Sequence, residues 1–137
     1  MKRRATVICE RDGRVLLVAR ARGRWAFPGG RANRDEDLAD AAARELKEET
    51  QLVAEDMRYA FQFRGLRTRH FVFVATVRSD AEPKPSNEIA RCGWLQLQEL
   101  GEMQASVPTK GIAEIFLRQA RGGRGIPLKE VLAIAAA

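Results

Sequence analysis

The N-terminal part of the chain contains two short apolar stretches separated by a turn. Ala5 to Cys9 predicts a short strand. Val15 to Ala19 is an uninterrupted apolar run, which is typical of a strand that is buried on both faces. Between them, Arg11 to Arg14 contains Asp-Gly, a pair that favours a two-residue hairpin turn. We therefore expect two neighbouring strands joined by a tight turn.

A helix is expected from Leu38 to Thr50. This segment contains no proline or glycine and is rich in alanine. Its apolar residues recur at every fourth position, which places them along one side of a helix. These residues are Leu38, Ala42 and Leu46.

Two further strands are expected after this helix. Met57 to Arg64 has alternating aromatic residues, which predicts a strand with one packed face. Gly65 to Arg69 is a turn, and His70 to Val77, rich in phenylalanine and valine, is its hairpin partner. The alternating aromatic residues are Tyr59, Phe61 and Phe63.

The last third of the chain changes character. Ser79 to Asn87 is a polar loop with two prolines, and its length suggests a functional role. A strand from Ile89 to Leu97 and a short turn or helical piece to Met103 follow. A helix is then expected over Lys110 to Arg121, capped by Thr109 or Ser106. Pro127 to Ala137 is an apolar tail, expected as a short last helix, a partner surface or a cover for the chain's own core. This order of elements indicates a mixed sheet with helices on its faces.

The composition indicates the class of protein and the compartment in which we expect it. Residues 1–137 are expected to form one domain, since 45% hydrophobic and 31% charged residues are ordinary for a soluble protein. The net charge is +6, and arginine supplies most of the cations, which suits either phosphorylated ligands or a solvated surface. Cys9 and Cys92 belong to no metal or redox spacing, and no stretch reaches membrane-spanning length. We therefore expect a cytoplasmic protein with no membrane partner.

The candidate chemistry lies in one stretch of loop and helix. Pro28-Gly29-Gly30 is a sharp loop with little side chain, so its backbone can approach a ligand closely. Glu45, Glu48 and Glu49 stand at i, i+3 and i+4 on one side of the expected helix, near the end where its dipole disfavours negative charge. Carboxylates that cluster where electrostatics disfavours them suggest that they bind a cation. Mg²⁺ takes oxygen ligands of this kind.

The loop and the acids together resemble the signature of the Nudix hydrolase family. That signature is Gly-x5-Glu-x7-Arg-Glu-U-x-Glu-Glu-x-Gly-U, in which U is a bulky aliphatic residue. The chain matches it from Gly30 to Leu52 at every specified position except Gln51, where the family has glycine. Glutamine adopts the left-handed conformation of a helix end at a cost of about 1 kcal/mol, so we expect a changed helix end and unchanged chemistry. The matching residues are Gly30, Glu36, Arg44, Glu45, Leu46, Glu48, Glu49 and Leu52.

The resemblance implies an α/β fold, the α/β/α sandwich of the family with its mixed β-sheet. It implies a Nudix-type pyrophosphohydrolase that acts on acid anhydrides and requires Mg²⁺, with Mn²⁺ as an alternative metal. In this reaction water attacks a phosphorus of a nucleoside triphosphate or of a nucleoside diphosphate linked to another group. Arg44 and Glu36 form a supporting ion pair, and Glu48 is a ligand or the general base. The implied metal ligands are Glu45, Glu48, Glu49 and the backbone carbonyl of Gly30.

Four residues outside these ligands complete the expected site. Glu88 precedes a tryptophan-containing strand, where family members place a glutamate that faces the metal, so it competes with Glu48 for the role of general base. Arg20 is the first choice for binding substrate phosphates, because it leaves a buried strand just before the glycine loop. Arg31 is a second candidate for the phosphates, and Phe27 for stacking on a base.

The sequence leaves the substrate and the assembly open. The markers of the ADP-ribose and diadenosine polyphosphate subfamilies are absent, so we expect a small phosphorylated molecule, in the first place a nucleotide. His70, the only histidine, contacts a base or phosphate or is structural. The alternatives are cleavage of the 5′ triphosphate of RNA, cleavage of a non-nucleotide diphosphate, or a module that senses a nucleotide without cleaving it. The oligomeric state stays open, with a homodimer among the alternatives.

Overall fold

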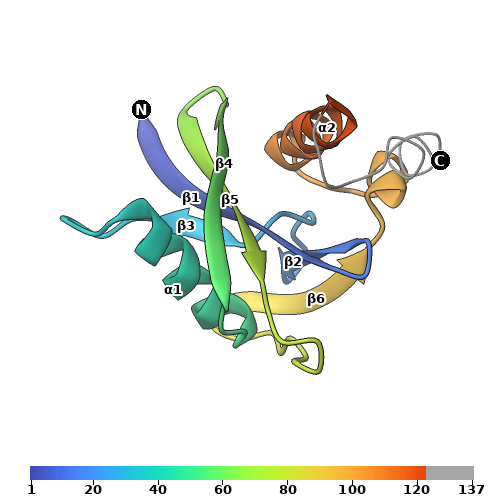
Figure 1. Ribbon diagram of the computed structural model, residues 1–137, viewed down its shortest axis with the longest axis horizontal. Coiled ribbons are helices and arrows are strands. Elements are labelled where there is room, and N and C mark those ends of the chain that lie inside the picture. The colour runs from blue at the N-terminus through green and yellow to red at the C-terminus, as the bar shows by residue number, and fades with distance from the viewer. Residues whose placement is uncertain (123–137) are drawn as a thin grey trace.

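The chain folds around a mixed six-stranded sheet with one long helix on each face (Figure 1). The computed structural model describes residues 1–122, and the apolar segment Pro127 to Ala137 lies outside them. In order, the elements are β1 (Lys2–Arg11), β2 (Arg14–Arg20), β3 (Gly29–Arg31), α1 (Leu38–Thr50), β4 (Asp56–Arg64), β5 (Thr68–Thr76), β6 (Ile89–Leu95), the 3₁₀ helix η1 (Leu97–Glu102) and α2 (Val107–Gly122). The α/β fold with a mixed sheet is confirmed.

The long first strand changes neighbours along its length. The strand order is β4-β5-β1-β2-β6, and β3 pairs with β1. β1 runs parallel to β5 from Lys2 opposite Thr68 onward, whereas its other pairings are antiparallel. It pairs with β2 only next to the hairpin turn, and its first half pairs with β3 instead. β2 therefore diverges toward β6, and the glycine loop comes to lie beside the first half of β1.

The expected hairpin and the doubly buried strand are both confirmed. Asp12 and Gly13 have φ of 53° and 75°, the positive values that a type I′ turn requires. Between Val15 and Ala19 no residue is more than 3% exposed. Alternate residues of the sheet fill two cores. One core lies under α1 and contains Val7, Leu16 and Leu46; the other lies under α2 and contains Ile8, Leu17 and Ile112.

The expectation that the aromatic residues of β4 share one packed face is wrong. The pairing of β4 with β5 shifts register between Tyr59 and Phe61. Tyr59 lies opposite Phe73, a residue of the core under α1, and remains 56% exposed. Phe61 lies opposite Val72 and is buried in the core under α2. The irregularity carries the strand from one face to the other, because an extra residue in a strand reverses the alternation of its side chains.

Both helices begin and end for local reasons. α1 has the expected bounds, and Gln51 caps it in the left-handed conformation at φ 64°, donating its N–H to the carbonyl of Lys47. α2 begins at Val107, three residues before the expected start, because the Ser106 hydroxyl accepts the N–H of Thr109 as a cap. Among the described residues, no helix is long and apolar enough to cross a membrane.

Candidate functional site

The glycine loop and the last two turns of α1 are built against each other. The backbone N–H of Gly29 donates to Oε1 of Glu49 at 2.9 Å. A Cβ on Gly30 would lie 2.5 and 2.7 Å from the two carboxylate oxygens of Glu45, which is closer than real Cβ contacts come. Any side chain at position 30 would therefore displace Glu45. The two glycines let the backbone touch carboxylates that stand one helical turn apart.

Burial disfavours the charged form of Glu49. Burial raises its pKa to about 7, and the charge of Glu45 adds to the effect. The N–H of Gly29 and the positive charges of Arg4 and Arg20 act in the opposite direction without cancelling the burial. Two carboxylates of this kind, partly removed from water, are stabilised when a cation is bound beside them.

Arg44 connects the loop after β3 to α1 through its side-chain hydrogen bonds. Its Nε and Nη2 donate to the two oxygens of Glu36 at 2.8 and 2.9 Å, which makes the expected ion pair bidentate. These bonds, with the N–H of Asn33, lower the pKa of Glu36 to about 2. Nη1 donates to Glu45 at 3.0 Å, and Nη2 donates to the carbonyl of Arg31 at 3.1 Å. Arg44 thus ties the loop after β3 to the helix and fixes the Glu45 carboxylate.

Glu48 is the most exposed of the three acids and shares Nη1 of Arg44 with Glu45. Its side chain is 44% exposed and contacts Nη1 of Arg44 at 3.2 Å. Within residues 1–122, no three His, Cys, Asp or Glu side chains are grouped closely enough to hold a metal ion. Glu45 and Glu49 supply only oxygen donors beside a backbone loop, and this donor set fits a hard divalent cation. The predicted set of three carboxylates and the Gly30 carbonyl stays a prediction.

Glu49 opens onto a cavity of about 420 Å³. Arg4 lines both this cavity and a second hollow of about 320 Å³, which lies between the sheet and α2. Arg4, Ala26, Phe27 and Ser106 line both spaces, so the two are neighbours. The first also contains Val18, Ala19, Arg20, Gly23, Arg24, Gly29 and Ile89, and the second contains Thr6, Thr68, His70, Pro108, Thr109 and Ile112.

Arg20 and Glu88 meet at the rim of the first cavity. Nη2 of Arg20 lies 2.5 Å from Oε2 of Glu88, and both side chains are more than 60% exposed. The loop before β6 reaches this point because the N–H of Ser86 donates to the carbonyl of Glu49 at the end of α1. The structure therefore brings Arg20 to the cavity, as expected, and engages Glu88 with Arg20 in place of the other acids. The role of Glu88 as a base stays a prediction.

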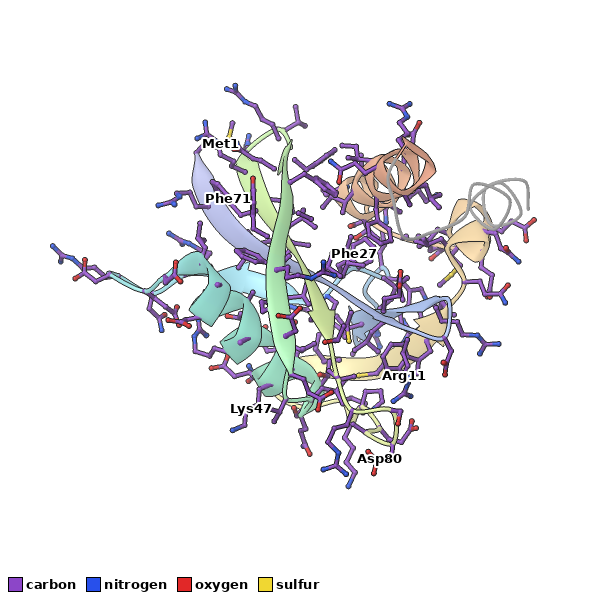
Figure 2. All side chains as sticks on the ribbon, viewed as in Figure 1. Met1, Arg11, Phe27, Lys47, Phe71 and Asp80 are labelled. Atoms are coloured by element: carbon purple, nitrogen blue, oxygen red, sulfur yellow. The ribbon has the colours of Figure 1, made fainter. Side chains whose placement is uncertain are left out.

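Burial corrects one of the expected substrate contacts, Phe27. Phe27 is 1% exposed and lies in the core under α2, near the centre of the molecule (Figure 2). Its ring offers no face for a base, so the expected stacking is wrong, and Phe27 acts as the floor of the cavity. Arg31 lies in hollows beside Met1 and Lys2, away from the cavity that Glu49 lines. Its expected role in binding substrate phosphates stays a prediction.

Arg4 is the residue that sequence reasoning missed. Burial lowers the pKa of its guanidinium, although Glu49 and Glu45 oppose the shift. Nη2 donates to the carbonyl of Phe27 at 3.1 Å, which holds the charge between the two hollows. The available signal was the i, i+2 spacing of Arg4 and Thr6, which places these two polar residues on one face of the strand.

Comparison with known proteins gives one consistent result. The NUDIX domain family model matches residues 1–115. A crystal structure assigned to the nudix hydrolase family, from Chromobacterium violaceum, is 32% identical with a TM-score of 0.80, and covers 99% of this chain and 91% of that one. A MutT protein from Methanosarcina mazei is 26% identical with a TM-score of 0.68, covering 86% and 94%.

Curated relatives extend the comparison to named proteins. The chain is 30% identical to human Nucleoside diphosphate-linked moiety X motif 6, over 87% of this chain and 42% of that protein. It is 32% identical to mRNA-decapping enzyme subunit 2 of Arabidopsis thaliana, over 82% and 32%. Phosphatase NudJ of Escherichia coli is 26% identical, over 95% and 91%. The chain thus spans less than half the length of the first two relatives and most of the third.

Proposed function

The chain belongs to the Nudix family of hydrolases, whose members act on acid anhydrides and generally use divalent metal ions, and on this basis we propose its reaction. It hydrolyses a diphosphate bond in a nucleoside triphosphate or in a nucleoside diphosphate linked to another group, and it depends on Mg²⁺. The observation that carries the proposal is the placement of Glu45 and Glu49 against Gly29 and Gly30, at the mouth of an arginine-lined cavity.

Glu45, Glu49, Glu48 and the Gly30 carbonyl are the residues proposed to hold the metal, and Mn²⁺ is an alternative to Mg²⁺. A bound divalent ion polarises the phosphoryl oxygens and lowers the pKa of bound water. Arg44 acts through the acids by holding Glu45 in place. Gly29 N–H holds Glu49 and limits the rotation of its carboxylate. The chain thus positions oxygen donors before the substrate arrives.

The remaining chemistry is a proton transfer and phosphate binding. Water attacks phosphorus, its proton passes to a carboxylate, and the P–O bond to the leaving phosphate breaks. Glu48 and Glu88 both remain candidates for that carboxylate, since Arg44 contacts the first at 3.2 Å and Arg20 contacts the second at 2.5 Å. Arg4 and Arg20 stand in the same cavity as Glu49 and bind the phosphate oxygens of the substrate.

A second candidate function is removal of phosphates from the 5′ end of RNA. The net charge of +6 and the relative named for mRNA decapping favour it. RNA binding of this kind weakens steeply as salt is raised, whereas turnover of a mononucleotide does so far less. A non-nucleotide diphosphate and nucleotide sensing without cleavage are further alternatives. The two free cysteines of the described chain fit the proposal of a cytoplasmic protein.

The test is release of phosphate and pyrophosphate from a substrate panel, with Mg²⁺ and with EDTA. The panel contains nucleoside triphosphates, ADP-ribose, a diadenosine polyphosphate, an inositol pyrophosphate and a 5′-triphosphorylated RNA. Glu49→Gln is expected to lower turnover at least about a hundredfold. Mutating a residue that only hydrogen-bonds to a metal ligand already lowers activity about 10- to 100-fold, and Glu49 is proposed as a ligand itself. Asp40→Asn, an exposed acid on the same helix, is the matched control. Equal turnover by Glu49→Gln and the wild type would refute the proposed site.

A further inference from the structure

Three polar residues form a buried chain of hydrogen bonds on the floor of the second hollow. Nε of Arg4 donates to the hydroxyl of Thr6 at 3.3 Å, and this hydroxyl lies 2.9 Å from Nδ1 of His70. Arg4 and His70 are direct neighbours across the parallel pair β1 and β5. Thr6 is 2% and His70 is 7% exposed. Residues this deeply buried need partners for all of their polar groups.

The chain of bonds fixes which nitrogen of His70 carries the proton. The guanidinium can only donate, so Thr6 accepts from Arg4. The hydroxyl proton of Thr6 then needs an acceptor, and Nδ1 is the one that the described residues place within reach. If Nδ1 carried the proton instead, the buried hydroxyl would have no acceptor, which is costly. The ring is therefore the tautomer with its proton on Nε2.

Nε2 of His70 is not fully enclosed by the described residues. Within residues 1–122, the buried side-chain nitrogens without a partner are Nε of Arg69 and Nε1 of Trp94, and Nε2 of His70 is not among them. His70 lines the hollow of about 320 Å³ and also an adjoining apolar groove. Phe63 packs edge-on against the ring, with centroids 5.9 Å apart, and fixes its orientation. Burial and the charge of Arg4 lower the pKa of His70 to about 4, so the ring is a neutral donor.

We propose that Arg4, Thr6 and His70 form a subsite in which Nε2 of His70, oriented by the other two residues, reads the base of the substrate by donating a hydrogen bond to a carbonyl oxygen. Arg4 stands on the wall shared with the Glu49 cavity, so a nucleotide with its phosphates in the first cavity extends past Arg4 to His70. The group that faces the base, Nε2 of His70, is a donor. An amino group at this place would meet a donor and leave both unpaired, so the subsite selects against it. The inference rests on the proposed function for the identity of the ligand.

ITP and ATP provide the matched pair of probes, because their bases differ in a carbonyl oxygen against an amino group. The expected result is a kcat/KM for ITP about tenfold above that for ATP, the size typical of one hydrogen bond and one unpaired donor. In His70→Gln the terminal amide nitrogen replaces Nε2, whereas in His70→Asn it lies near the position of Nδ1. We expect His70→Asn to lose more of the ITP preference than His70→Gln. Equal kcat/KM for ITP and ATP in the wild type would overturn the subsite.

The tautomer is tested without turnover. His70 is the only histidine, so the ¹⁵N spectrum of its ring requires no assignment. We expect the pattern of a neutral ring protonated on Nε2, retained in Thr6→Ser and lost in Thr6→Val, which keeps the shape but lacks the hydroxyl. A proton on Nδ1 in the wild type would overturn the inference. Titrating ITP and ATP in EDTA measures binding without turnover, so a shifted Nε2 signal and tighter ITP binding there would support the subsite. Absence of hydrolysis of every substrate once Mg²⁺ is restored would refute the hydrolase and leave that binding result standing, which separates the two proposals.

Discussion

Gly30→Ala tests whether the glycine loop exists to admit a carboxylate. The new Cβ would lie 2.5 and 2.7 Å from the oxygens of Glu45, so the carboxylate must move. Gly30 has no positive φ, so alanine fits the backbone and strain is confined to this contact. Moving Glu45 breaks its bond from Arg44, and a bond to a charged group contributes about 1.5–3 kcal/mol. Alanine also restricts the unfolded chain, which offsets about 0.4–1 kcal/mol.

The net expectation is a loss of about 1–2 kcal/mol in stability, together with a fall of about a hundredfold in kcat/KM. Urea unfolding measures the first, and metal-dependent turnover of the substrate found in the panel measures the second. Gly101→Ala is the control, because a Cβ there meets nothing within 4 Å; it should leave turnover unchanged and raise stability by about 0.4–1 kcal/mol through the unfolded chain. Full activity in Gly30→Ala would show that the observed position of Glu45 is not needed for the reaction.

Three more changes follow from the same contacts. Leu46→Ala removes a fully buried side chain from the core under α1 and should lower the free energy of unfolding by about 2–5 kcal/mol in urea; a loss below about 1 kcal/mol would contradict the packing. Glu36 has a folded pKa of about 2 against an ordinary 4.5, so its contribution is complete above pH 4.5 and is lost as the pH falls from 4.5 to 2. Thermal unfolding of Glu36→Gln should therefore depend less on pH in this window than that of the wild type, and an unchanged dependence would refute the ion pair. Arg20→Ala should raise KM about three- to tenfold with little change in kcat, since its guanidinium is exposed; an unchanged KM would remove it from the substrate site.

Local chemistry explains why much of the fold was predictable. The Asp-Gly turn, the uninterrupted apolar strand and the proline-free segment Leu38 to Thr50 each depend on neighbours in the sequence, and all three are present. The spaced pattern from Gly30 to Leu52 likewise keeps loop and helix in one short stretch. Its acids and glycines are therefore close in the sequence, and the pairing of β3 with β1 completes their placement.

Features that depend on distant pairing were not predictable. The reversal of faces between Tyr59 and Phe61 comes from a register shift against β5, which alternation along one strand does not reveal. Arg4 and His70 are 66 positions apart and meet only because β1 and β5 are parallel neighbours. Phe27 was expected at the surface of the site, but the turn into β3 directs it into the core.

Binding of a divalent ion tests the central claim most directly, because it needs no knowledge of the substrate. Mn²⁺ provides the signal, in a titration followed by electron paramagnetic resonance, with Mg²⁺ as competitor. The account predicts that the wild type and Asp40→Asn bind Mn²⁺ alike, and that Mg²⁺ displaces it. Glu45→Gln and Glu49→Gln should each weaken binding at least about tenfold. Equal Mn²⁺ affinity in all four proteins would contradict the claim that Glu45 and Glu49 hold the metal.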